Sequence, residues 1–299
     1  MKKKNSLDIL MFLKALRIHQ WLKNILVFLP ILAAFQFDYN TINYSLLSFL
    51  SFCFMSSSVY LINDIFDLKF DKKHPQKKNR PLASGNISLK SYKIFIFFLF
   101  VISLITALLI NITFTFLILF YFCIAFSYSY IFKRFSIIDL CILASLYTLR
   151  IVAGSEAASI DVSFWLVVFS IFFFLSLSSV KRQAELVNLK KIKILKIYGR
   201  DYMIDDLLFI TTISISSGLI SILVLILYIN DPSVIDLYSK PQAFWVICFI
   251  LLFWLLRMIF IAHRGKINED PVTFAVKDRT SQICFVIVLF LFLMSKILI

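Results

Sequence analysis

The sequence predicts an all-α integral membrane protein, a bundle of nine transmembrane helices, and three observations support this fold class. Hydrophobic residues make up 61% of the 299 residues, charged residues only 16%, and the mean hydropathy is +0.90. A soluble domain is about half apolar and a quarter charged. Nine apolar runs follow one another along the chain, most of them close to the length of about 20 residues that a spanning helix needs. Basic residues gather in every second connection, as expected of alternating sides of a membrane.

Each run is expected to be a helix, because lipid offers no hydrogen-bond partners to the backbone. Barrel strands would be only about ten residues long, with alternating hydrophobicity. Residues 5–20 precede the first run and are amphipathic, so we expect them on the membrane surface and do not expect a cleaved signal peptide. In chain order, the nine runs are 22–37, 42–62, 91–110, 112–132, 137–153, 162–180, 207–229, 242–263 and 280–299.

The segments outside the runs alternate in charge. Starting at the N-terminus, every second segment is basic, and these segments hold six, eight, two, seven and four Lys and Arg. The basic segments are 1–23, 63–93, 133–136, 181–206 and 264–279. The other connections hold only Lys240 and the C-terminal end only Lys296, while Arg150 and Arg257 lie inside apolar runs. By the positive-inside rule, this predicts a bacterial-type inner-membrane protein with a cytoplasmic N-terminus, an extracytoplasmic C-terminus and a site facing the cytoplasm.

Charge and cysteine usage exclude other classes. A net charge of +14 would suggest a nucleic-acid partner for a soluble protein. Here the basic residues lie between membrane runs, so we expect anionic ligands and no nucleic acid. The five cysteines all lie in apolar runs and are interpreted as buried hydrophobic residues, not as a disulfide framework. The chain shows no internal repeat and no low-complexity linker, so we expect one transmembrane domain, 1–299.

Three carboxylates follow the second run at helical spacing. Asp64, Asp67 and Asp71 occur at i, i+3 and i+7, which places them on one helix face within about 60°. Carboxylates so close repel one another unless they share a cation, and hard oxygen ligands select Mg²⁺, which commonly bridges to phosphate. The sequence therefore predicts a Mg²⁺ site there. The other interpretation is a solvated, charged helix end.

A basic loop follows directly at 72–85 and includes Lys78 and Arg80. Basic side chains beside a metal site suit a diphosphate, whose charge the metal neutralises only in part. Arg80 is the preferred candidate, because Pro81 restricts it to an extended conformation and its planar fork suits phosphate. Positive-inside charge and anionic lipid binding are the other interpretation of the loop.

These motifs carry a family resemblance. The pattern Asn-Asp-x-x-Asp-x-x-x-Asp at 63–71, followed by Asn-Arg-Pro-Leu-x-Ser-Gly at 79–85, resembles the UbiA superfamily of intramembrane prenyltransferases. The resemblance covers the whole chain and implies nine spans and a cytoplasmic active site. It also implies that Asp64, Asp67 and Asp71 are the metal-binding and catalytic residues, with Asn63 contacting substrate.

The sequence departs from the superfamily pattern after the sixth run. Members usually have a second Asp-rich motif there, whereas this chain has Lys181-Arg182-Gln-Ala-Glu185-Leu. With Gln-Trp-Leu-Lys-Asn at 20–24, this run resembles a subgroup, the decaprenyl-phosphate phosphoribosyltransferases. The resemblance implies that Lys181, Arg182 and Glu185 serve the 5-phosphate of phosphoribosyl pyrophosphate. One alternative is a helix end balanced by positive charge.

A second alternative places the missing acidic motif slightly later in the chain, at Asp201, Asp205 and Asp206.

Other polar residues belong to the predicted spans. Lys23 and Asn24 begin the first run and are candidates for phosphate binding, and Tyr128 is a candidate for contact with ribose or phosphate. An aromatic belt at the membrane interface is the other interpretation of Tyr128. Asp139 and Arg150 share one helix face about 16 Å apart, too far to pair, and intramembrane charges usually line a cavity.

The function expected from this resemblance is Mg²⁺-dependent transfer of a 5-phosphoribosyl group from phosphoribosyl pyrophosphate to a polyprenyl phosphate, with release of pyrophosphate. Two alternatives stay open. An aromatic prenyltransferase would use the same Mg²⁺ site for a prenyl diphosphate. A lipid transporter would show inverted repeats and broken helices, but the chain has only five glycines.

Overall fold

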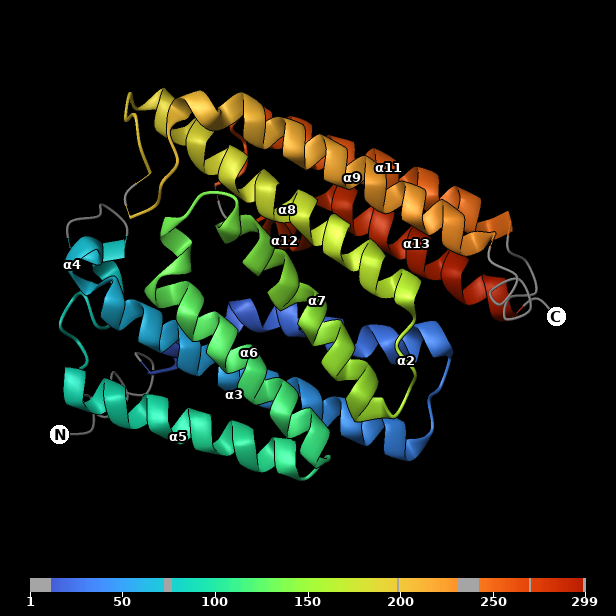
Figure 1. Cartoon of the computed structure of the whole chain (residues 1–299), viewed down its shortest axis with the longest axis horizontal. Helices are drawn as coiled ribbons and strands as arrows, with labels where there is room; N and C mark the ends of the chain where they lie inside the picture. Colours follow the sequence, from blue (N-terminus) through green and yellow to red (C-terminus); the bar gives the residue numbers. More distant parts are fainter. Residues whose placement is uncertain (1–11, 73–76, 198, 231–241, 269, 298–299) are drawn as a thin grey trace. The chain divides into compact units, whose positions relative to one another are not determined.

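The structure is a computed structural model that describes residues 12–72, 77–197, 199–230, 242–268 and 270–297 (Figure 1). Within those ranges every regular element is a helix, and an isolated bridge between Lys196 and Met203 is the one β-type pairing. The predicted all-helical membrane architecture is thereby confirmed.

Seven helices are long and apolar enough to cross a membrane. Their apolar lengths agree with the runs read from the sequence, although several helices extend past the runs at polar ends. They are α3 (Tyr39–Phe66), α5 (Leu89–Leu108), α6 (Ile112–Tyr130), α7 (Ile138–Ala158), α8 (Phe164–Lys191), α9 (Leu207–Ile229) and α11 (Gln242–His263).

The predicted number of nine spans is not reached among the described residues, which give seven, or eight with a bent pair. The bent pair is α12 (Pro271–Lys277) and α13 (Arg279–Ile297), which meet at an angle of 87°. The run 22–37 forms a 3₁₀ helix, η1 (Ile18–Phe28), followed by the short α2 (Leu29–Ala34). Pro30 at the start of α2 lacks the N–H that a continuous helix would need there.

Short polar side chains fix where several helices begin. Asp38 accepts a hydrogen bond from the Thr41 backbone N–H at the start of α3, and Ser88 does the same for Ser91 at the start of α5. Such caps satisfy backbone donors that the first helical turn leaves without a partner.

The chain divides into two compact units, which are described separately. Unit 1 comprises Met1–Ile142 and Leu146–Val162, and unit 2 comprises Leu143–Ser145 and Ser163–Ile299. The expectation of one domain stays a prediction.

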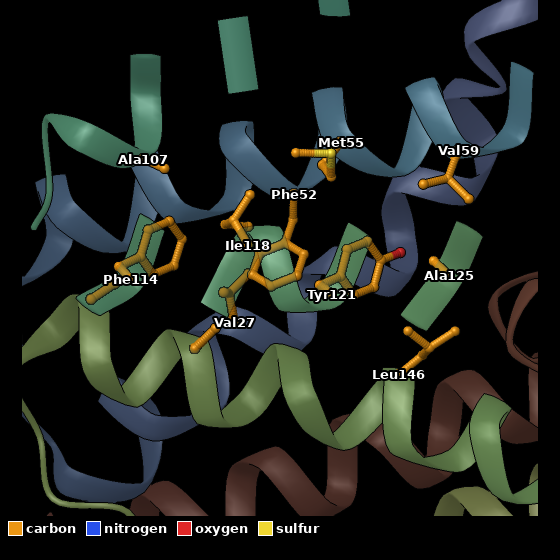
Figure 2. Close-up of a cluster of buried hydrophobic side chains, with 12 residues drawn as sticks. Val27, Phe52, Met55, Val59, Ala107, Phe114, Ile118, Tyr121, Ala125 and Leu146 are labelled. Atoms are coloured by element: carbon orange, nitrogen blue, oxygen red, sulfur yellow. The ribbon is translucent and has the colours of Figure 1, made fainter. Parts of the chain in front are cut away.

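The core of unit 1 is aromatic. Figure 2 shows the Phe52 ring between Phe114 and Tyr121. The ring centroids are 6.2 and 5.2 Å apart, in edge-to-face arrangements, a geometry that aromatic rings prefer. Gly154 of α7 packs directly on η1, since a Cβ added to it would lie 2.2 Å from the Val27 carbonyl oxygen.

Unit 2 is organised by α8 and α9, which lie side by side (Figure 1). The Ser176 hydroxyl donates to the Ser214 carbonyl at 2.7 Å, and the Ser214 hydroxyl donates to the Ser176 carbonyl at 3.2 Å. Small residues that bond across a helix pair are typical of membrane helix packing.

Replacing Gly154 tests the contact between α7 and η1. We expect Gly154→Ala to lower the free energy of unfolding by about 1–3 kcal/mol, the usual cost of overpacking, even though Ala favours helix more than Gly does. Gly218→Ala is the matched control, because its new Cβ would meet side-chain atoms of Ser176 and Leu255 at 3.1 Å or more, and side chains can shift by a few tenths of an ångström. Unfolding in a detergent titration measures both variants, and equal stability of the two would contradict the close approach.

Candidate active site at the end of α3

The three predicted carboxylates lie where α3 ends and the short α4 (Leu68–Asp71) begins. Asp67 forms the junction and is the C-cap of α3. Asp64 and Asp71 are each 3% exposed, whereas the Asp67 side chain is 27% exposed. Two of the three charges are therefore withdrawn from solvent and need partners.

Asp64 has three such partners in unit 1. The Arg17 guanidinium forms an ion pair with its Oδ1, Arg80 Nη1 donates to the same oxygen at 3.1 Å, and the Tyr92 hydroxyl donates to Oδ2 at 3.0 Å. The donors come from the segment before η1, the loop after α4 and α5. Segments far apart in sequence thus converge on one carboxylate.

Arg80 also binds the third carboxylate. Its Nη1 lies 2.6 Å from Asp71 Oδ2, so one guanidinium bridges Asp64 and Asp71. This charge-assisted bridge holds the loop against the carboxylate face. The structure places Arg80 beside the acidic cluster, and its role toward substrate stays a prediction.

Asp67 is held by a different cation. Lys133 Nζ lies 2.6 Å from Asp67 Oδ1 and 3.0 Å from the Asn63 side-chain oxygen, and Asn63 Nδ2 donates to Asp67 at 3.0 Å. Lys133 belongs to the 3₁₀ turn η3 (Phe132–Arg134) after α6. Sequence reasoning missed Arg17, Tyr92 and Lys133, which carry no motif of their own; for the two basic residues the one available indication was their place in predicted cytoplasmic segments.

Within the described part of the chain, no three His, Cys, Asp or Glu side chains are arranged to hold a metal ion. The carboxylate oxygens instead face guanidinium and ammonium groups. The donor set still has the hard oxygens that Mg²⁺ requires, and the paired cations are groups that bind phosphate. A ligand that carries both a metal ion and phosphate would give the carboxylates a cation and the basic side chains an anion at the same time.

Two other candidates lie elsewhere in unit 1. Lys78 is exposed in the 3₁₀ turn η2 (Lys77–Asn79). The Tyr128 hydroxyl donates to Asp139 at 2.8 Å, which joins the end of α6 to the start of α7. Neither residue is brought to the three carboxylates by a described contact.

Lys23 and Asn24 of η1 are buried, and Asn24 accepts a hydrogen bond from Arg150 Nε at 2.8 Å. Arg150 is 4% exposed, so it does not extend to the membrane surface. As expected, Asp139 and Arg150 have different partners.

Unit 2 carries the basic run of α8. Lys181 Nζ lies 3.1 Å from Asp270 Oδ2, and Arg182 Nη1 lies 2.5 Å from Glu185 Oε2. Arg182 is fully buried, with its guanidinium 5.9 Å from the centroid of the Tyr202 ring. Glu185 pairs with Arg182 one turn earlier in α8.

The later acidic residues have local partners. Asp201 pairs with Lys196 at 3.2 Å, and both side chains are more than half exposed. Asp206 accepts a hydrogen bond from the Met203 backbone N–H at 2.8 Å. These contacts close a surface turn before α9.

The helical membrane fold and the carboxylate cluster at the end of α3 are the features to compare with known proteins. Residues 25–191 match the model of the UbiA prenyltransferase family, so the chain belongs to this family. Nodulation protein NoeC of Azorhizobium caulinodans is 30% identical over 91% of this chain and 89% of its own. Uncharacterized protein y4nM of Sinorhizobium fredii is 32% identical over 90% of this chain, which spans only 53% of y4nM.

A third relative and a solved structure agree with the family. Decaprenyl-phosphate phosphoribosyltransferase of Mycolicibacterium smegmatis is 28% identical over 91% of this chain and 88% of its own. A UbiA homolog from Archaeoglobus fulgidus, solved bound to GPP and Mg²⁺, superimposes with a TM-score of 0.71. That likeness covers 94% of this chain and 99% of the homolog at 18% identity, and it shows the shared fold.

Removing the Arg80 bridge tests the geometry of the cluster. We expect Arg80→Gln to lower the free energy of unfolding by about 2–3 kcal/mol, because two largely buried carboxylates each lose a charged partner. Adding Asp71→Asn should recover part of that loss, since it removes one of the two charges left behind. Lys78→Gln, a neutralised cation in the same loop but exposed, is the control; a loss equal to that of Arg80→Gln would refute the bridge.

Proposed function

We propose that this chain transfers a 5-phosphoribosyl group from phosphoribosyl pyrophosphate to a polyprenyl phosphate and releases pyrophosphate. The observation that carries the proposal is the pair of basic residues in α8, Lys181 bound to Asp270 and Arg182 bound to Glu185, in the segment where superfamily members usually have a second acidic motif. A basic pair with Arg182 buried and Lys181 half-buried suits a phosphate monoester better than a second metal ion. Similarity to a decaprenyl-phosphate phosphoribosyltransferase along most of both chains supports the same reaction.

The carboxylates at the end of α3 would serve the diphosphate. Asp64, Asp67 and Asp71 would hold Mg²⁺, which would neutralise charge on the departing pyrophosphate. The Mg²⁺ in the Archaeoglobus homolog supports this assignment.

The basic groups beside the carboxylates would then change partners. Arg17, Arg80 and Lys133 are bound to Asp64, Asp71 and Asp67, and they would turn to phosphate oxygens when substrate enters. Positive groups fixed around a leaving group stabilise the charge that develops in the transition state.

The chemistry at the sugar needs no general base. An oxygen of the polyprenyl phosphate is already anionic; it forms the new bond to C1 of the ribose, while the bond from C1 to the pyrophosphate oxygen breaks and pyrophosphate takes the electron pair. Stabilising the leaving group is therefore the main task of the protein.

In unit 2, the 5-phosphate would take the place of carboxylates as the partner of Lys181 and Arg182. Arg182 offers a planar fork that matches two phosphate oxygens, and the packed Tyr202 ring keeps it oriented.

A second candidate is transfer of a prenyl group from a prenyl diphosphate to an aromatic acceptor such as a quinone or haem precursor. The GPP in the Archaeoglobus homolog favours it. It would use the α3 carboxylates in the same way and would give Lys181 and Arg182 no phosphate to bind.

Turnover tests the two candidates directly. Membranes containing the chain should convert labelled phosphoribosyl pyrophosphate and polyprenyl phosphate into a labelled lipid, and chelation of Mg²⁺ should stop the reaction. Asp64→Asn should reduce the rate at least about a hundredfold, because a group that stabilises developing charge is typically worth that much. Consumption of a prenyl diphosphate with no use of phosphoribosyl pyrophosphate would establish the second candidate instead.

The variant Arg182→Ala distinguishes binding of the 5-phosphate by Arg182 from a role in balancing the charge at the end of α8. A charge-assisted hydrogen bond is worth about 1.5–3 kcal/mol, so Arg182→Ala should weaken phosphoribosyl pyrophosphate binding about ten- to a hundredfold. Binding of Mg²⁺–pyrophosphate, which lacks the 5-phosphate, should change less than threefold. Lys196→Ala removes an exposed cation of the same unit and is the control. Equal weakening of both ligands would show that Arg182 acts only through general charge.

The same proposal places the carboxylate cluster on the cytoplasmic side, supported by the distribution of Lys and Arg. A reporter inserted in the 72–79 loop should then behave as cytoplasmic, and one fused after Ile299 as extracytoplasmic, since short basic segments stay inside. Two cytoplasmic reporters would show an even number of spans, and an extracytoplasmic loop would overturn the orientation.

A further inference from the structure

Arg150 is a charged group inside a membrane-spanning helix, and no part of the proposed reaction has used it. It lies in α7 and is 4% exposed. Its guanidinium donates to the Asn24 side-chain oxygen at 2.8 Å, to the Tyr121 hydroxyl at 2.7 Å and to the Leu146 carbonyl. None of these three partners carries a negative charge, so among the described residues the guanidinium has hydrogen bonds but no carboxylate partner.

A second cation approaches the same place. The guanidinium carbon of Arg150 lies 5.6 Å from the centroid of the Tyr147 ring, and Lys23 Nζ lies 5.7 Å from that centroid. Arg150 also lies 4.9 Å from the centroid of the Tyr121 ring. Both cations are more than nine-tenths buried. Aromatic faces stabilise cations, but two like charges in a medium of low dielectric repel each other.

The other intramembrane arginine shows what a compensated charge looks like in this chain. Arg257 of α11 binds both oxygens of Asp278, at 2.6 and 2.9 Å. Charged groups in membrane segments usually pair with one another or line a functional cavity. Arg150 differs from Arg257, because its hydrogen-bond partners are two neutral side chains and a backbone carbonyl.

A contact with α3 places Arg150 further into the span than the carboxylate cluster, since its guanidinium lies 5.9 Å from the centroid of the Phe52 ring, and Phe52 precedes Asp64 in α3. Tyr60, one turn before Asp64, lies under the Arg17 guanidinium at 5.4 Å. Asn24, which binds Arg150, also contacts Ser56 at 3.3 Å, and Ser56 precedes Asp64 by about 12 Å along the helix at 1.5 Å per residue. Polar side chains therefore continue from Asp64 into the span through Tyr60, Ser56, Asn24 and Arg150. Of these groups, Asp64 alone carries a negative charge.

We propose that Lys23 and Arg150 form a second phosphate site, which takes the phosphate monoester of the polyprenyl phosphate acceptor. The choice of this ligand rests on the proposed function, in which Lys181 and Arg182 hold the other monoester of the reaction. A diphosphate bound at Asp64 would leave roughly two helical turns, about 11 Å, for the ribose and the attacking phosphate. The phosphate brings the negative charge that Arg150 lacks, with the Asn24 and Tyr121 groups beside it.

Ligand binding to the purified full-length chain tests the site. The probe for the lipid phosphate is farnesyl phosphate, a short isoprenyl monophosphate, and the probe for the sugar phosphate is phosphoribosyl pyrophosphate. We expect Arg150→Gln to weaken farnesyl phosphate binding at least tenfold, Arg150→Lys to restore it to within about threefold, and neither to change phosphoribosyl pyrophosphate binding more than threefold. Arg264→Gln, which removes an exposed cation stacked on Phe260, should leave both ligands unaffected.

Lys23→Met provides a second variant if Arg150→Gln does not fold, and it should show the same selective loss. Weakened phosphoribosyl pyrophosphate with unchanged farnesyl phosphate would overturn the lipid assignment and give the site to the 5-phosphate. Unchanged binding of both probes in both variants would overturn the site itself. Arg150-dependent farnesyl phosphate binding by a chain that does not consume phosphoribosyl pyrophosphate would refute the proposed function and leave the phosphate site standing.

Discussion

The organisation of unit 1 depends on the need to balance the buried carboxylate of Asp64. Its two oxygens take donors from Arg17, Arg80 and Tyr92, so the segment before η1, the loop after α4 and α5 are all joined to the end of α3. Breaking a buried ion pair leaves a charge that low-dielectric surroundings cannot solvate. The same contacts that hold the fold thus keep three oxygen ligands and several phosphate-binding groups within one small volume.

Arg150 and Arg257 differ in whether a carboxylate balances their charge. Arg257 and Asp278 satisfy each other at the break between α12 and α13, and their removal would loosen that bend. Arg150, by contrast, has neutral partners, and the carboxylates of the α3 cluster face cations that prefer phosphate. On the proposed function, this arrangement would receive an anionic substrate together with Mg²⁺.

Local pattern predicted the helices, because periodicity and lipid burial act over one or two turns. The single helix face for Asp64, Asp67 and Asp71 stays a prediction, since α3 ends at Phe66 and Asp71 belongs to the separate α4. Local pattern also indicated the family now shown by comparison. It did not predict the partners of those carboxylates: Arg17 and Lys133 lie 47 and 66 residues from theirs, and long-range pairing leaves no spacing to recognise. Among the described residues seven or eight helices qualify as spans instead of the nine predicted, because an apolar run does not reveal the 3₁₀ geometry of η1 or the bend at Asp278.

We propose that Arg17, Arg80 and Lys133 stay bound to the α3 carboxylates until a diphosphate arrives with its metal. A titration of the purified chain with Mn²⁺, followed by electron paramagnetic resonance with and without pyrophosphate, tests this exchange; the metal–pyrophosphate complex without protein is the reference. We expect weak Mn²⁺ binding without pyrophosphate, at least tenfold tighter binding with it, and loss of that gain in Asp64→Asn. Equal affinity in both conditions, or a gain that survives Asp64→Asn, would contradict it.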